Sequence, residues 1–513
     1  MKHVARSSII VGFFFGLEKV LGFVRYTIIA RTFGLSGELD AFNAANNLPD
    51  LVFALISGGA LAMALIPVLS EHLENDGRQA AWDIFSRIGN LLFIVTAGFS
   101  ILIAIFANQI VRSKIGIAPG FDSDQQALVA DLMRLNLIAT LFFSMSGLII
   151  AGLQANQHFW LPAIAPSMYD VGTLIGVLIL VPGQGYTFGG VTLPAFGLGI
   201  HGLVYGTILG ALLFLLVQIP GLIHFKFRWT ARINLQHPGV QQVIRLMLPR
   251  IGTVFCIQLI FIAQDNFASR LAAGSVTALV YGWLFMQVPE SLIGTAIGTA
   301  LLPTISEQIS RGNTDAFRRS LAHTVRAILA LTLPSTVLLA VGIRPLVGIL
   351  GFDSVGTELV VWTVRAYMLG LVGHSLLEVA ARAFYAQQKA LTPLAASGLT
   401  AVIFITLGLL LSPRLGAAGI GLANTIAFSV EAGLLFWLLE RRVPQWLQIG
   451  KPLLRIGLAS AGSGIVLYFS LRLLSLASLS TLMSTLAAIG VLVFCALLVL
   501  PFIWSEVKMM GTI

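Results

Sequence analysis

The chain has 513 residues, of which 57% are hydrophobic and only 10% are charged. Soluble domains carry about 25% charged residues, so these charges are too few to cover the outside of so long a folded chain, and most of its surface must face lipid. The composition excludes a soluble enzyme, a secreted disulfide scaffold and a disordered chain. Apolar runs such as 91–107 lack the alternating pattern of a β-barrel strand, so they predict membrane-spanning helices.

The net charge of +9 does not indicate a nucleic-acid partner, because the basic residues collect in short loops between apolar runs. Cys256 and Cys495 both lie inside apolar stretches, which predicts buried free thiols and no zinc site. The pair Gly450-Lys451 is followed by Pro452, so there is no P-loop, and the histidines are scattered without metal-ligand spacing. The sequence therefore predicts no enzyme activity, no cofactor and no metal.

At about 20 apolar residues per crossing, the chain predicts about 14 membrane-spanning helices. They are expected at 7–31, 40–69, 84–109, 128–153, 161–182, 198–223, 241–270, 276–306, 317–343, 357–386, 392–412, 417–439, 452–474 and 479–503. We expect the first to stay uncleaved, because Glu18 and Lys19 interrupt its apolar run and no small-residue cleavage site follows. Prolines within the second and eighth spans predict kinks.

Basic residues also predict the orientation of the chain in the membrane. If the N-terminus is inside, the even-numbered loops and both termini hold most of the loop arginines and lysines, among them Lys226, Arg228, Arg318 and Arg441. The opposite side has fewer, such as Arg112. The positive-inside rule then predicts that both termini are cytoplasmic, which agrees with an even number of spans.

An internal repeat predicts the arrangement of the spans. The segment "ALIPVLSE" at 64–71 returns as "ALLPTISE" at 300–307, and "LQANQHFWLP" at 153–162 parallels "FYAQQKALTP" at 384–393. Six predicted spans separate the two copies of the repeat. Because an even number of crossings returns the chain to the same side of the membrane, the two copies share one orientation. The prediction is an all-α polytopic membrane protein with two parallel six-helix lobes, related by an axis along the membrane normal, plus two C-terminal helices.

The repeat also predicts the domain boundaries. We expect an N-terminal lobe at 1–223, a basic cytoplasmic linker at 224–240, a C-terminal lobe at 241–440 and the last two helices at 441–513.

Ionisable groups inside spans are the best pointers to function, because each costs several kcal/mol in lipid unless it faces a partner or a wet cavity. Lys19 and Arg25 lie on the first span, where the arginine offers a bidentate fork for the phosphate of a substrate. Asp40, Asn43 and Asn47 form an i, i+3, i+7 stripe on the second span. All five are candidates for substrate binding, and the alternative is an ion pair such as Arg25 with Asp40 that locks two helices.

The second half holds candidates for coupling to an ion gradient. Asp265 and Glu290 can bind a proton or cation, although an internal salt bridge explains them equally well. His374, Glu378 and Arg382 form an i, i+4, i+8 ladder that we expect to satisfy itself. Two further acids stand alone inside spans, Asp170 and Glu431.

Several of these segments resemble a known family. The text "LGFVRYTIIARTFGLSGELDAFNAANNLPDL" at 21–51, "SGGALAMALIPVLSE" at 57–71 and "GTAIGTALLPTISEQISRGN" at 294–313 is similar to the lipid II flippases, the MurJ/MviN family of the multidrug/oligosaccharidyl-lipid/polysaccharide exporter superfamily. The resemblance implies a bacterial inner-membrane flippase that moves a polyprenyl-pyrophosphate-linked peptidoglycan precursor from the inner to the outer leaflet by alternating access. It matches Arg25 to a cavity arginine of the family, Asp40 to the acid that opens the second helix, and Lys19 to a position where many members have arginine.

The chain departs from the family pattern at Phe53 and Leu284, where members usually have arginine, and 392–412 lacks the acidic or amide residues of the sodium site found in some members. Fewer guanidinium groups favour a cargo with less charge. The alternatives are therefore an exporter of another lipid-linked oligosaccharide or amphiphile, or a membrane scaffold that does not transport. The expected partners are a lipid-linked pyrophosphate precursor and membrane lipids, and no oligomeric state is predicted.

Overall fold

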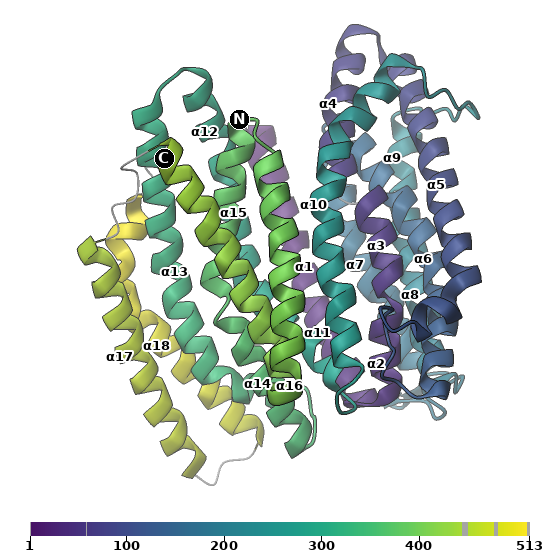
Figure 1. The fold of residues 1–513 in the computed structure, drawn as a ribbon. Helices are drawn as coiled ribbons and strands as arrows, with labels where there is room; N and C mark the ends of the chain where they lie inside the picture. Colours follow the sequence, from purple (N-terminus) through teal and green to yellow (C-terminus); the bar gives the residue numbers. More distant parts are fainter. Residues whose placement is uncertain (1, 58, 444–449, 477–480, 510–513) are drawn as a thin grey trace. The chain divides into compact units, whose positions relative to one another are not determined.

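The computed structural model describes residues 2–57, 59–443, 450–476 and 481–509, which are almost entirely helical (Figure 1). The helices are α1 (Lys2–Phe33), α2 (Gly37–Ala45), α3 (Asn47–Ile56), α4 (Gly59–Asn75), α5 (Arg78–Arg112), α6 (Ser123–Ala155), α7 (Trp160–Ile175), α8 (Gly199–Leu216), α9 (Ile219–His224), α10 (Pro238–Ala268), α11 (Ser275–Glu290), α12 (Ala296–Ser310), α13 (Thr314–Gly348), α14 (Ser354–Met368), α15 (Leu371–Ala386), α16 (Leu391–Arg442), α17 (Gly450–Leu476) and α18 (Thr481–Met509). Two single π-helical turns, at Gly176–Leu180 and Ser291–Thr295, continue α7 and join α11 to α12.

The loop between α7 and α8 contains a small hairpin that the sequence did not predict. Its strands β1 (Thr187–Phe188) and β2 (Val191–Thr192) pair antiparallel. Gly189 and Gly190 form the two-residue turn with φ of 56° and 89°, values that glycine adopts without steric cost.

The predicted membrane-spanning helices are confirmed. Among the described residues, 12 helical segments are long and apolar enough to cross a membrane. One of them, α16, has 52 residues and contains two predicted spans, divided at Gly416, whose φ of 59° and ψ of −142° are not helical. The first predicted span, 7–31, lies within α1. The all-α polytopic fold is therefore as expected from the sequence.

The chain divides into two compact units, Met1–Arg270 and Leu271–Ile513. The first holds α1 to α10 and the second holds α11 to α18. Helix α10 belongs to the first unit because it packs on α3 and α4. The repeat assigns this helix to the second lobe instead, and the lobe boundaries at 223 and 241 stay a prediction.

Close contact between α7 and α8 organises the first unit. A Cβ added at Gly172 would lie 2.3 Å from the Cα of Gly210, and one added at Gly176 would lie 2.6 Å from the Cα of Gly206. Small residues spaced four apart let two helix backbones touch, which is the usual way of packing helices in lipid. Asp170 precedes Gly172 by two residues, roughly 200° around the helix, so its carboxylate points away from α8.

The second span of each repeat copy is interrupted. In the first unit the chain leaves the helix between α3 and α4, where Ser57 has φ of −124°. A Cβ at Gly147 of α6 would lie 2.7 Å from the carbonyl oxygen of Ser57, so α6 packs directly on this break. In the second unit the π-helical turn Ser291–Thr295 follows Pro289. The interruption of the second predicted span is thus a break between α3 and α4, and that of the eighth is a widened, π-helical turn between α11 and α12.

The two C-terminal helices pack on α13, as the green and yellow ribbons of Figure 1 show. Ala330 of α13, Ile456 of α17 and Val499 and Ile503 of α18 are buried together in one apolar cluster. The two C-terminal helices are therefore joined to the second unit by apolar packing on α13.

The glycine contact gives a first prediction. Gly206→Val places a branched side chain where a Cβ alone would lie 2.5 Å from the Cα of Gly176, so the two helices must separate. We expect a loss of about 1–3 kcal/mol of stability, seen as a lower Tm of the purified protein in detergent.

Gly98→Val is the matched control, because a Cβ at Gly98 of α5 meets nothing within 4 Å. An unchanged Tm for Gly206→Val, or equal losses for both variants, would contradict the role of the α7–α8 contact.

Candidate functional site

A buried ion pair joins α1 to α7. The Nε atom of Arg25 lies 2.8 Å from Oδ1 of Asp170, and the two side chains are 13% and 3% exposed. Gly22, one turn before Arg25 on α1, leaves room for the carboxylate, which lies 3.9 Å from where a Cβ would be. A charge inside a membrane span needs a partner, and here each group supplies it to the other.

Two tyrosines complete the surroundings of Arg25. Its Nη1 donates to the Oη of Tyr169 at 3.4 Å, and its guanidinium carbon lies 4.4 Å from the ring centre of Tyr26 and 5.0 Å from that of Tyr169. Aromatic faces attract cations, and most strongly away from water. A guanidinium carries five N–H donors, and that of Arg25 interacts with Asp170, Tyr169 and Tyr26.

Lys19 lies on the same helix, nearer the N-terminus. Its Nζ is 3.2 Å from Oε2 of Glu18 and 5.0 Å from the ring centre of Phe15, and its side chain is 47% exposed. Both Glu18 and Lys19 are close enough for their charges to act on Asp170. Lys19 and Arg25, the two predicted cationic residues, therefore belong to one electrostatic cluster around Asp170.

Residues that the sequence reading missed also belong to this cluster. Tyr26 and Tyr169 contact the guanidinium directly, and Asp50 on α3 is exposed and close enough to act electrostatically on Tyr169. The sequence contains one indication of the two tyrosines, because Tyr26 directly follows Arg25 and Tyr169 directly precedes Asp170. Nothing in the sequence indicated that positions so far apart would meet.

The polar stripe of the second span forms a different cluster. Asn47 of α3 donates its Nδ2 to Oδ2 of Asp265 on α10 at 2.5 Å and also reaches the carbonyl oxygen of Phe261 at 3.4 Å. Asp40 of α2 is 1% exposed, and its charge acts on Asp265. Asn43 is half-buried and has interactions of its own. These amide contacts tie α3 to α10, as polar residues commonly do between helices in lipid.

The ion pair of Arg25 differs from the alternative that the sequence suggests. The sequence suggests Asp40 as the partner, but the carboxylate paired with Arg25 belongs to Asp170. Asp40 follows α1 closely in the sequence, but it lies on α2, which packs on α6 and α8, and its charge acts on Asp265 of α10. The packing of α1 on α7 decides the pairing.

Glu290 lies in the second unit, at the widened turn. Its carboxylate accepts hydrogen bonds from Oγ1 of Thr295 at 3.1 and 3.3 Å, across the π-helical turn. Arg382 of α15 donates to Oγ1 of Thr299 at 3.1 Å and is close enough to act on Glu290. Asp265 and Glu290, the two predicted coupling residues, thus lie in separate units with separate partners.

The ladder on α15 is only partly self-satisfied. Arg382 pairs with Glu378 as predicted. His374 instead has its Nε2 3.0 Å from Oδ1 of Asn424 and stacks on Phe428 at 4.3 Å between ring centres. The other lone acid, Glu431, is 6% exposed and accepts a hydrogen bond from Thr400 at 2.8 Å. In the described part of the chain, no group of three or more His, Cys, Asp or Glu is placed to hold a metal ion.

Phe53, where an arginine was expected, extends the aromatic surroundings of Arg25. Its ring centre lies 5.9 Å from that of Phe143, which lies 5.4 Å from that of Tyr169. Leu284 of α11 is half-buried. An aromatic row therefore leads from α3 to the guanidinium, on the side where a second cation was expected.

The fold and the charged groups inside its spans define a polytopic α-helical membrane protein. Its fold is similar to that of an inward-facing multidrug resistance MATE family transporter of the MOP superfamily, with a TM-score of 0.67 at 14% identity, covering 82% of this chain and 94% of that one. The structure of a lipid II flippase MurJ in an inward closed conformation matches with a TM-score of 0.76 at 22% identity, covering 95% of this chain and 98% of that one.

The chain belongs to the lipid II flippase MurJ family, whose sequence profile matches residues 29–494. The lipid II flippase MurJ of Burkholderia cenocepacia is 29% identical over 475 residues, covering 90% of this chain and 89% of that protein. A MurJ relative in Thermotoga maritima is 28% identical over 463 residues, covering 89% and 88%. The family resemblance inferred from the motifs is confirmed, and the match extends over nearly the whole chain.

The buried ion pair gives a second prediction. Arg25→Met or Asp170→Leu alone leaves one charge buried without its partner, which costs about 3–5 kcal/mol. The double variant removes both charges and fills the space with apolar side chains, so its Tm should recover toward that of the parent while its transport stays lost. The measurements are Tm in detergent and complementation of a strain depleted of its own flippase.

If the double variant restores growth as well as Tm, the pair serves only to join α1 to α7. If the double variant is as unstable as the two single variants together, the charges do not interact as the structure places them.

Proposed function

We propose that this chain is a flippase that carries lipid II, a peptidoglycan precursor on a polyprenyl pyrophosphate, from the inner to the outer leaflet by alternating access. Membership of the family supports the cargo. The observation that carries the site is Arg25, a cation kept inside a span by one carboxylate and two tyrosine rings. Guanidinium is the side chain best suited to phosphate, because its fork matches two oxygens at once.

Substrate binding in this proposal is a competition for Arg25. The pyrophosphate approaches the N–H donors that Asp170 does not use, and Lys19 supplies a second, more exposed positive charge nearby. The anion weakens the hold of Asp170 because the two negative groups repel each other. When the cargo leaves, Asp170 again neutralises Arg25, so an empty site does not keep an isolated charge inside the membrane.

Coupling to an ion gradient is proposed for Asp265 and Glu290. The carboxylate of Asp265 accepts a hydrogen bond from the amide of Asn47, and that of Glu290 accepts one from the hydroxyl of Thr295. Arg382, whose charge also acts on Glu290, is itself paired with Glu378. A carboxylate held by neutral donors gains or loses a proton without leaving a buried cation unpaired. Proton coupling therefore suits both positions.

The aromatic row ending at Phe53 favours a second candidate cargo, a lipid-linked oligosaccharide or amphiphile with less charge. Phe53 offers an apolar face where a second guanidinium would bind the other phosphate group. Under this alternative, monophosphate lipids compete for binding better than pyrophosphates do.

Binding of the cargo gives a third prediction. Arg25→Lys keeps the charge and loses the fork, so affinity for lipid II should fall by about tenfold to a hundredfold, the range expected for one hydrogen bond to a charged group. Purified protein titrated with lipid II measures this directly, and complementation of a flippase-depleted strain measures transport.

Arg326→Lys on α13, outside the Arg25 cluster, is the matched control and should bind like the parent. Failure of the parent both to complement and to bind lipid II, with the protein inserted in the membrane, would reject the lipid II assignment.

We also propose that the chain lies in the bacterial inner membrane with both termini in the cytoplasm, as the positive-inside rule indicates. A fourth prediction tests this orientation in cells. A cysteine at Thr187, in the β hairpin, should react with a membrane-impermeant maleimide, whereas one at Arg311, between α12 and α13, should react only after permeabilisation. The background variant lacks Cys256 and Cys495, and the reverse labelling pattern would contradict the proposed orientation.

A further inference from the structure

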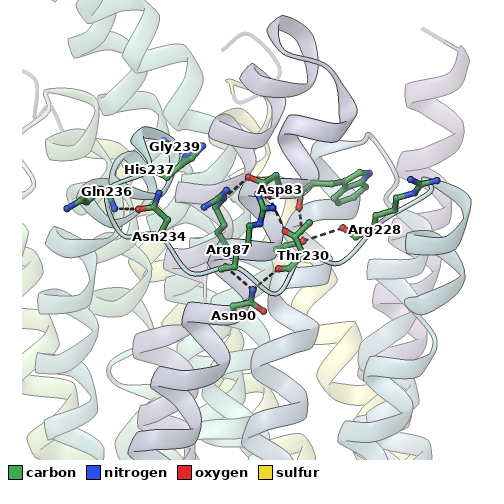
Figure 2. A network of polar contacts seen from close by, with 12 residues as sticks. Asp83, Arg87, Asn90, Arg228, Thr230, Asn234, Gln236, His237 and Gly239 are labelled. Atoms are coloured by element: carbon green, nitrogen blue, oxygen red, sulfur yellow. Dashed lines mark hydrogen bonds and ion pairs between the residues drawn. The ribbon is translucent and has the colours of Figure 1, made fainter.

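The segment between α9 and α10 is fixed to the first unit by hydrogen bonds to α5, as Figure 2 shows. Asn90 donates its Nδ2 to the carbonyl oxygens of Thr230 at 2.8 Å and Arg232 at 3.0 Å. The Oγ1 of Thr230 donates to Asp83 at 3.2 Å, and Asp83 is in turn paired with Arg87 at 2.6 Å. We call residues 225–237 the linker strap.

Aromatic packing holds the other half of the linker strap. Trp82 of α5 donates its Nε1 to the carbonyl oxygen of Phe225 at 3.2 Å, and the ring centre of Phe227 lies 5.2 Å from those of Trp82 and Phe85. The linker strap is therefore a structured part of the first unit.

The outer side of the linker strap has the composition of a surface that lies on a membrane. Three of its exposed residues are basic, and large apolar side chains lie exposed among them, with Trp229 52%, Ile233 53% and Leu235 54% exposed. The basic residues are Lys226, Arg228 and Arg232. Tryptophan beside arginine and lysine is typical of the membrane interface, where the ring lies at headgroup level and the cations meet phosphate.

An apolar groove begins next to the linker strap. It has a volume of about 360 Å³, and α3, α4, α5 and α10 contribute its walls. On α5 the groove starts at Ile88 and continues through Leu91 and Leu92, on either side of Asn90, which binds the strap. On α10 it starts at Val243, a few residues after the strap ends.

Every described side chain that lines the groove is apolar, among them Val52, Ile56, Leu92, Val95 and Met247. Phe99 and Leu248, 51% and 66% exposed, lie at its margin, so the groove is open to the exterior of the unit.

Positive charge predominates where the groove meets the linker strap. Arg232 is exposed on the strap, and Arg245 is exposed beside the groove residue Ile244 on α10. Asp83 is neutralised by Arg87, and Glu71 accepts a hydrogen bond from Gln242 at 3.4 Å. This combination complements an anionic headgroup attached to a hydrocarbon chain.

We propose that this groove and the linker strap bind one anionic phospholipid of the bilayer, with its phosphate on Arg232 and Arg245 and one acyl chain in the groove. The volume is near the lower end of the roughly 300–1,000 Å³ of ligand pockets, which suits a single acyl chain. The site contains neither Arg25 nor Asp170, so it does not depend on the proposed cargo. The bound lipid would hold the linker strap, and with it α5 and α10, at the headgroup level.

The test is a lipid titration of the full chain by native mass spectrometry, with phosphatidylglycerol against phosphatidylcholine of the same acyl chains. The parent should prefer phosphatidylglycerol. Arg232→Gln with Arg245→Gln should lower that affinity by about fivefold for each arginine removed, and leave phosphatidylcholine binding unchanged.

Two further variants keep the result interpretable. Val95→Trp fills the groove and should weaken both lipids, whereas Arg441→Gln with Arg442→Gln removes two exposed arginines from α16 and should change neither. Equal binding of the two lipids by the parent, an undiminished preference in the Arg232 and Arg245 variant, or displacement of bound phosphatidylglycerol by lipid II would overturn the proposal.

Discussion

A cation that is buried in a membrane span has to be neutralised within the protein, and the arrangement of the first unit follows from that constraint. Arg25 lies on α1 and its carboxylate partner lies on α7, so these two helices must be neighbours. Asp170 in turn reaches α1 because the glycines of α7 face α8. One polar pair and one stripe of small residues thus join three helices, and a buried apolar cluster that includes Ile29, Val177 and Leu203 packs between them.

The sequence predicted the helices better than it predicted their contacts. Spans follow from length and hydropathy, which are local properties, and even the division of α16 was visible as a gap between 412 and 417. The charged residues of the site were also found, since ionisable groups are rare in spans. The partner of Arg25 was not, because choosing between Asp40 and Asp170 requires the neighbours of α1. His374 shows the same limit, since it turns from its own helix toward Asn424 on α16.

Aromatic rings surround the guanidinium of Arg25. Tyr26 and Tyr169 flank it, and Phe143 connects Tyr169 to Phe53. Rings attract one cation but do not attract an anion, so they preserve the position of Arg25 without adding to its charge. Consistent with the low charge content of the sequence, the candidate site is centred on one arginine, which contacts one carboxylate and two tyrosine rings.

The interruptions of the two proline-rich spans occur at the same step of the internal repeat. Ser57, at the break after α3, and Ile293, inside the widened turn, are separated by the same 236 residues that separate Ala64 from Ala300. A helix that lacks one turn of regular hydrogen bonds bends there more easily than elsewhere. Each half of the chain consequently has an elbow at the same point along its own second span. Flexing at an elbow would swing the segment that carries Asp50 in one half and the segment beside Glu290 in the other, while the remaining helices keep their packing.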